Sequence, residues 1–181
     1  IDVNHTGLSA DLLFTGLTVD AGAGDSGFRV SSDGAIDGIQ LTDSTFNGGA
    51  FGINIANTGG GDDNVENATF SNLTFNGQTT KYVNPSGGSR AIFIEKLSNA
   101  SFSDIEINAP SSGTFDDLRA FHLKLKGQNF ENISVDGMDI NDFDEAQADA
   151  KSGEYNPLVL LSVKGEGGPA VLGLVVKPPA G

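Results

Sequence analysis

The chain has 181 residues, a formal net charge of −14 at pH 7 and no cysteine. This length fits one domain, residues 1–181, while the acidic balance argues against a nucleic-acid partner and the missing cysteines exclude a disulfide scaffold. No apolar run approaches a membrane span, and the chain starts with Ile1 instead of Met, so we expect a processed form or a fragment of a longer chain.

One six-residue phrase recurs along the chain, with the pattern apolar, any, Asn/Asp/Gly, Ile/Leu, any, apolar. Its six copies are Phe14–Val19, Ile36–Leu41, Phe70–Phe75, Phe102–Ile107, Phe130–Val135 and Val171–Val176. The last three residues of each copy alternate as in a half-buried strand. The third position holds residue types that tolerate a left-handed backbone, so we expect a sharp bend before each strand.

A second short strand is predicted before most copies of the phrase. These strands cover residues 28–30, 51–55, 92–94, 121–125 and 159–163. Two strands per coil, repeated at intervals of roughly 22 to 41 residues, are typical of a parallel β-solenoid. We therefore predict an all-β, right-handed parallel β-helix of about six coils, on the order of 30 Å long at ~4.8 Å per strand spacing.

The phrase also predicts which side chains stack on one another. One internal column should contain Phe14, Ile36, Phe70, Phe102, Phe130 and Val171. One outward column should contain Thr18, Gln40, Thr74, Glu106, Ser134 and Val175. On the second strands, the outward column should contain Arg29, Gly52, Phe93, His122 and Leu160.

Long insertions are expected to emerge mainly at one edge of the solenoid, after the phrase and before the next coil. The candidate metal ligands on that edge are Asp116, Asp117, Asp139, Asp142, Asp144 and Glu145. Carboxylate oxygens suit calcium, whereas the alternative is a solvated acidic face. The spacing does not fit an EF-hand loop, and no other cofactor is predicted. A capping-box pattern from Asp142 to Glu145 predicts a short helix ending near Gly153.

The coil pattern, with Arg90 and Arg119 at one position of successive coils, resembles the right-handed parallel β-helix (pectin-lyase-like) superfamily. That superfamily includes pectate lyases, polygalacturonases, phage tailspikes and autotransporter passengers, and the resemblance covers nearly the whole chain but concerns the fold. Only two of the polygalacturonase motifs have partial counterparts in this chain. These counterparts are Asn57-Thr-Gly and Gly61-Asp-Asp, and both lie in one glycine-rich loop. The two histidines, His5 and His122, suggest no catalytic triad. No catalytic residue is therefore assigned, and an enzyme is the less favoured hypothesis.

The end coils of a solenoid expose unpaired strand edges. Near the C-terminus lies the most apolar segment of the chain, in which even the outward position, Val175, is apolar. Two outward residues of the second strands, Phe93 and Leu160, are apolar as well. The predicted interface residues are therefore Leu174, Val175, Val176, Phe93 and Leu160.

These observations support a non-catalytic, extracellular or cell-surface solenoid with a structural or adhesive role. Its end coils would join a longer solenoid or a second copy, end to end into filaments, and a cell-surface glycan or protein would be its other partner. The alternative hypothesis is a polysaccharide lyase or glycoside hydrolase of the β-helix superfamily. A carboxylate cluster with a basic residue on one sheet face would favour the enzyme.

Overall fold

The structure, a computed structural model, describes residues 1–5, 9–22, 24–32, 36–55, 65–78, 90–95, 97–110, 119–126, 132–141, 159–164 and 175–177. Within these residues the chain forms strands and turns and contains no helix. The predicted helix near residues 142–153 lies outside them.

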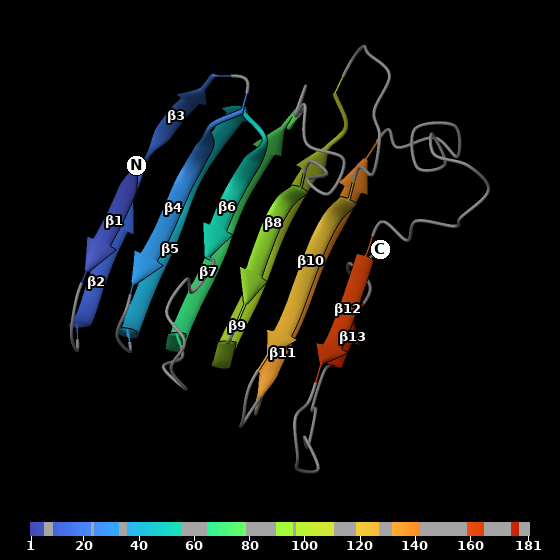
Figure 1. The fold of residues 1–181 in the computed structure, drawn as a ribbon. Helices are drawn as coiled ribbons and strands as arrows, with labels where there is room; N and C mark the ends of the chain where they lie inside the picture. The colour runs from blue at the N-terminus through green and yellow to red at the C-terminus, as the bar shows by residue number, and fades with distance from the viewer. Residues whose placement is uncertain are drawn as a thin grey trace.

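The strands form two parallel sheets (Figure 1). Sheet A contains β1 (Asp2–His5), β4 (Ser26–Ser32), β6 (Phe51–Ile55), β8 (Arg90–Glu95), β10 (Arg119–Lys126) and β12 (Val159–Lys164), in that order. Sheet B contains β13 (Val175–Lys177), β11 (Ile133–Asn141), β9 (Leu97–Asn108), β7 (Val65–Asn76), β5 (Ile36–Gly48) and β2 (Ser9–Thr15), and β3 (Thr18–Ala21) also pairs with β5.

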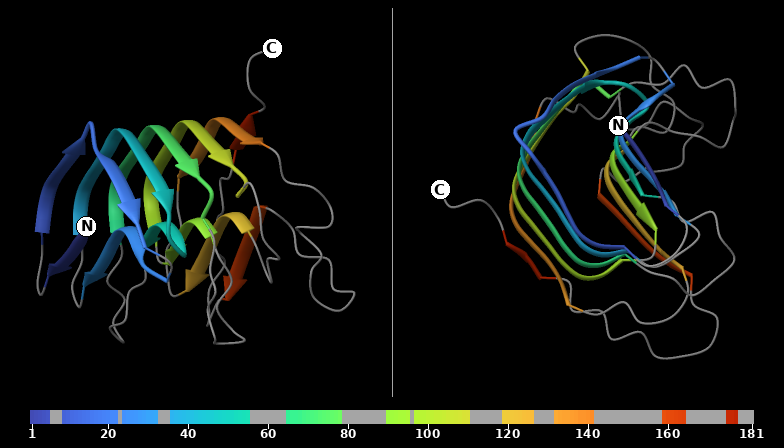
Figure 2. Two further views of the ribbon diagram at one scale, coloured as in Figure 1. Left: turned by 90° about the horizontal axis from the view of Figure 1, so that it is seen from above. Right: turned by 90° about the vertical axis from the view of Figure 1, so that its left-hand side faces the viewer.

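Apart from β2 and β3, which both pair with β5 in sheet B, successive strands of the chain alternate between the two sheets, which makes the molecule a solenoid. In the end-on view of Figure 2, with the N-terminus toward the viewer, the chain runs clockwise from β2 through β3 to β4, which is the right-handed sense. The predicted all-β parallel solenoid is confirmed. We call one sheet B strand, with the sheet A strand that follows it, a rung. Rung 1 contains β2, β3 and β4.

Within each rung, the sheet B part bends twice, at residues with positive φ. The first bend is at Asp11, Gly38, Asn67, Asn99 and Asn132, and the second is at Gly16, Asp43, Asn72, Asp104 and Gly137. Asn, Asp and Gly adopt this conformation at lower cost than other residues. One rung therefore carries the phrase, as in Phe70–Phe75, and also a looser copy of it, Val65–Phe70, with Ala68 in place of Ile or Leu. The two copies share Phe70.

This doubling corrects the predicted internal column. Ile36 pairs with Val65, and Leu41 takes the place beside Phe70. Likewise, Val135 lies beside Phe102, in the place that was predicted for Phe130. Both predictions were wrong because these two copies belong to the first bend, not the second. Phe130 and Val171 themselves lie outside the described residues.

The outward columns shift for the same reason. One column contains Thr18, Thr45, Thr74, Glu106 and Asp139. A separate column contains Leu13, Gln40, Thr69, Ser101, Ser134 and Val175. In sheet A, Asn54 rather than Gly52 lies between Arg29 and Phe93.

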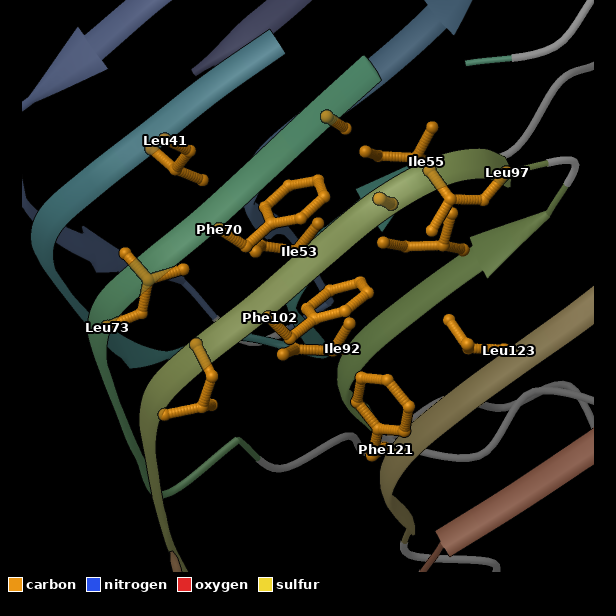
Figure 3. Packing of buried hydrophobic residues seen from close by; sticks show 14 of the residues in the cluster. Leu41, Ile53, Ile55, Phe70, Leu73, Ile92, Leu97, Phe102, Phe121 and Leu123 are labelled. Atoms are coloured by element: carbon orange, nitrogen blue, oxygen red, sulfur yellow. The ribbon is translucent and has the colours of Figure 1, made fainter. Parts of the chain in front are cut away.

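Inward-facing side chains of both sheets fill the space between them (Figure 3). The predicted stacking of Phe70 on Phe102 is confirmed, with ring centroids 4.8 Å apart and an interplanar angle of 10°. Phe121 of sheet A meets Phe102 edge to face at 5.1 Å. Burial of apolar side chains, these rings among them, is the dominant favourable term in folding.

Candidate functional site

A ladder of amide side chains runs along the outer surface where the sheet B strands end. Nδ2 of Asn47 donates to Oδ1 of Asp20 at 2.8 Å, and Asn76 donates to Asn47 at 2.9 Å. Asn108 donates to Asn76 at 2.9 Å, and Asn141 donates to Asn108 at 3.1 Å. Each amide thus donates toward the N-terminal side, and five rungs are joined by one directed chain of hydrogen bonds.

Asn76, in the middle of this ladder, gives a first prediction. Asn76→Ala removes one donor and one acceptor, so two partly buried partners lose a hydrogen bond. We expect a loss of about 1–3 kcal/mol in the free energy of unfolding, measured by urea denaturation. Asn141→Ala removes only one bond of the ladder and should cost less. Equal losses for the two variants would contradict the directed ladder.

The bend residues form shorter ladders of the same kind. Asn67 donates to Asp37 at 2.6 Å, Asn72 to Asp43 at 2.7 Å, and Asn132 to Asn99 at 3.0 Å. Asn67, Asn72, Asn99 and Asn132 begin Asn-x-Ser/Thr triplets. Their positive φ and their ladder contacts give each of them a structural reason to be Asn, independent of any glycan.

Asp43 gives a second prediction, on pH dependence. The hydrogen bond from Asn72 is the main cause that lowers the pKa of Asp43 below its usual 3.8, and Thr42 and Thr15 also contribute. A carboxyl whose pKa is lower in the folded state stabilises the fold above the unfolded pKa, and this contribution is lost as pH falls through the folded pKa. Asp43→Asn should therefore reduce the loss of stability below about pH 3.8, measured by urea denaturation across that range. In an Asn72→Ala background the same substitution should change the pH profile less.

An open hollow of about 560 Å³ lies at the N-terminal end of the solenoid. Its lining includes Asp2, Asp20, Asp25, Arg29 and Asn54. Two of the carboxylates already have protein partners, because Asp2 lies 3.9 Å from Arg29 and Asp20 accepts the hydrogen bond from Asn47. Among the described residues, no three His, Asp or Glu side chains gather closely enough to hold a metal ion.

The outer face of sheet A holds a packed cluster that was not predicted from the sequence. Nε of Arg90 donates to Nδ1 of His122 at 2.8 Å, and both residues are buried. The guanidinium of Arg90 lies 5.1 Å from the ring centroid of Phe93 and 6.0 Å from that of Phe51. Nδ1 of His122 accepts this hydrogen bond, because Nε of arginine always carries its proton. Arg90 is thus a packed residue and not a base exposed on an open face.

The predicted register of Arg90 and Arg119 is confirmed, because the two residues pair between β8 and β10. On the same strands, Lys124 pairs with Glu95. The sequence signal for the Arg90–His122 contact was the Arg-Ala pair that opens both β8 and β10, the strand that contains His122. Its recognition required the knowledge that the two side chains point to the same outer face.

Four of the five predicted interface residues fall within described strands. Phe93 is half-buried on β8, and Leu160 of β12 is in register with His122. Val175 and Val176 form β13 with Lys177 and pair with Ser134 and Val135. Leu174 lies outside the described residues.

Only one predicted metal ligand is described. Asp139 is exposed on β11, in register with Glu106 of β9. Asp116, Asp117, Asp142, Asp144 and Glu145 lie outside the described residues, so the proposed calcium site stays a prediction.

In comparisons with known proteins, no family model, no curated protein and no solved structure matches the chain. Among the described residues, no helix has the length and apolar character needed to cross a membrane. The function is therefore inferred from the fold and from the surfaces described above.

Proposed function

We propose that the protein is a non-catalytic extracellular β-solenoid with a structural or adhesive role. The observation that carries this proposal is the use made of the outward polar side chains of sheet B. Asn47, Asn76 and Asn108 each bond to the equivalent residue on both neighbouring rungs. Side chains committed to such ladders hold the rungs in register and are not free to converge on a substrate.

A finer proposal concerns the class of solenoid. Parallel rungs with Asn, Asp and Gly at two bends are consistent with the β-helix fold, and we group the chain with the non-catalytic adhesins and autotransporter passengers of the pectin-lyase-like superfamily. A ladder of amides on the outside and an apolar core inside suit a rod with a structural role. A cell-surface glycan or protein remains the proposed external partner.

The test is an assay for polysaccharide cleavage. The purified protein is incubated with acidic and neutral polysaccharides, with and without calcium, and released reducing ends and unsaturated products are measured. We expect no product above that of heat-denatured protein, whether or not the polysaccharide binds. Product that depends on the native protein would overturn the proposal in favour of the lyase or hydrolase.

A further inference from the structure

The amide ladder contains both Asn-Gly pairs of the chain. They are Asn47-Gly48 and Asn76-Gly77, and no other asparagine of the sequence is followed by glycine. The pairs lie at the ends of two neighbouring sheet B strands, β5 and β7. Their glycines share a left-handed backbone, with φ +65° at Gly48 and +64° at Gly77, so the two pairs have the same local geometry.

An Asn-Gly pair can react with itself in water. Because glycine has no Cβ atom, its backbone nitrogen is the least hindered in approaching the side chain of the preceding asparagine. The nitrogen attacks Cγ, a new C–N bond closes a succinimide ring, and the side-chain nitrogen leaves as ammonia together with the proton of the glycine amide. Water then opens the ring at either carbonyl and leaves aspartate or isoaspartate. The reaction consumes water, releases ammonia and needs no other reactant.

The ladder holds both asparagine side chains away from this path. Both are only partly buried, so water reaches them. Asn47 donates to Asp20 at 2.8 Å and accepts from Asn76 at 2.9 Å, and Asn76 in turn accepts from Asn108 at 2.9 Å. Since these partners lie on the adjacent rungs, Cγ can turn toward the glycine nitrogen only after both hydrogen bonds of its amide are broken.

The attacking nitrogen of the second pair is held as well. The backbone nitrogen of Gly77 donates to the carbonyl oxygen of Asn108 at 3.0 Å. The next residue, Gln78, is 3% exposed, and its Nε2 donates to the carbonyl oxygen of Phe46 at 2.9 Å. The reaction at Asn76 therefore requires the end of β7 to open locally, away from both neighbouring rungs.

The products could not rebuild the ladder. Aspartate in place of Asn47 would set a carboxylate against Asp20, where an amide now donates, and like charges opposite each other destabilise a sheet. Aspartate in place of Asn76 would have no N–H group to donate to Asn47. Isoaspartate would also add one carbon atom to the main chain, and so would disturb the register of the residues that follow.

We propose that Asn47 and Asn76 are deamidation sites that the amide ladder protects, and that conversion of either one breaks the ladder irreversibly. The ladder thus has a chemical role in addition to holding the rungs in register. This modification involves only described rungs and does not depend on the function proposed above.

The experiment compares the folded 181-residue chain with the same chain in urea, both at mildly alkaline pH. Peptide mapping by mass spectrometry measures aspartate and isoaspartate at each asparagine. We expect Asn47 and Asn76 to react at least about tenfold more slowly in the folded chain, because two hydrogen bonds must open. Asn108 and Asn141 belong to the same ladder but precede Ala109 and Asp142, so they should stay slow in both states. The proposal is overturned if Asn47 and Asn76 react equally fast in both states, or no faster in urea than Asn108 and Asn141.

A substitution within the ladder tests whether the protection is local. Asn76→Ala removes the donor to Asn47 and leaves its contact with Asp20 in place, so deamidation at Asn47 should become about fivefold faster. Gly16→Ala is the matched control, because it weakens the fold at a bend outside the ladder and should leave that rate unchanged. Equal acceleration by both variants would show that the reaction passes through global unfolding, which overturns the proposal. If circular dichroism shows Asn76→Ala unfolded, Asp20→Ala replaces it, and an unchanged rate at Asn47 is again the contrary result.

The consequence of the reaction is tested with variants that reproduce its aspartate product. Asn47→Asp and Asn76→Asp should each lower the midpoint of urea denaturation. Gln40→Glu is the matched control, since it makes the same change from amide to carboxylate on β5, where its neighbours in register are Leu13 and Thr69. It should leave the midpoint nearly unchanged. Midpoints of Asn47→Asp and Asn76→Asp equal to that of Gln40→Glu would overturn the claim that deamidation breaks the ladder.

Discussion

Replacing Gly52 with alanine should lower the free energy of unfolding by about 3 kcal/mol or more. A Cβ atom at Gly52 would overlap Cδ1 of Phe75 and would lie 2.6 Å from its Cε1 and 2.7 Å from the carbonyl oxygen of Ala91. The ring of Phe75 is fully buried and stacked on Phe46 with centroids 5.4 Å apart, so it has little room to withdraw. Urea denaturation followed by circular dichroism measures the loss.

The next rung supplies the control for this prediction. Ala91 occupies the position of Gly52 on that rung, and Ile107 occupies the position of Phe75. An alanine in one sheet is thus matched by a smaller side chain in the other. Gly52→Ala with Phe75→Ile should therefore recover most of the stability lost by Gly52→Ala alone. Additive losses from the two substitutions would contradict this match of volumes.

Gly16 separates the effect of crowding from that of backbone conformation. It has φ +67° but nothing within 4 Å of a Cβ atom. Gly16→Ala should cost only about 1–2 kcal/mol, the penalty of the left-handed conformation. A loss as large as that of Gly52→Ala would show that crowding is not the decisive term.

The architecture could be predicted because the bends have a strong local signature. Asn67 and Asn72, or Asn99 and Asp104, are residue types that accept positive φ, and the apolar residues between them alternate. The same signature caused the register error. The two bends of a rung have the same residue pattern, so the copies that begin at Ile36 and Phe130 fitted either bend. The local sequence contains nothing that distinguishes the first bend from the second.

The surface features depend on that register and were therefore harder to predict from the sequence. The apolar ends of one outward column, Leu13 and Val175, share a column only when Gln40 and Ser134 are placed between them. The repeated phrase alone places Thr18 at the N-terminal end of that column. Similarly, the contact of Arg90 with His122 requires two residues 32 positions apart to share one face. Such contacts depend on the tertiary stack and not on local propensity.

Phe102→Ala should produce the second large effect, a loss of about 3–5 kcal/mol in the free energy of unfolding. The side chain is 1% exposed, stacks on Phe70 and meets Phe121 edge to face, so it joins rungs 3 and 4 and both sheets. Leu13→Ala, at a position that is 64% exposed, is the control and should change little in the monomer. A double-mutant cycle with Phe70→Ala should give a coupling of about 0.5–1.5 kcal/mol from the stacked rings.

The Phe102 cavity should also reveal how stability is distributed along the stack. Each rung of a solenoid contacts only its neighbours, so weakening β9 loosens the link between β7 and β11. β5 keeps its pairing with β2, β3 and β7, whereas β11 is left with β9 and the short β13. In Phe102→Ala, hydrogen exchange should therefore accelerate more at β11 amides than at β5 amides. Equal acceleration at both strands would mean that the solenoid unfolds as one unit, and that coupling along the stack reaches beyond nearest neighbours.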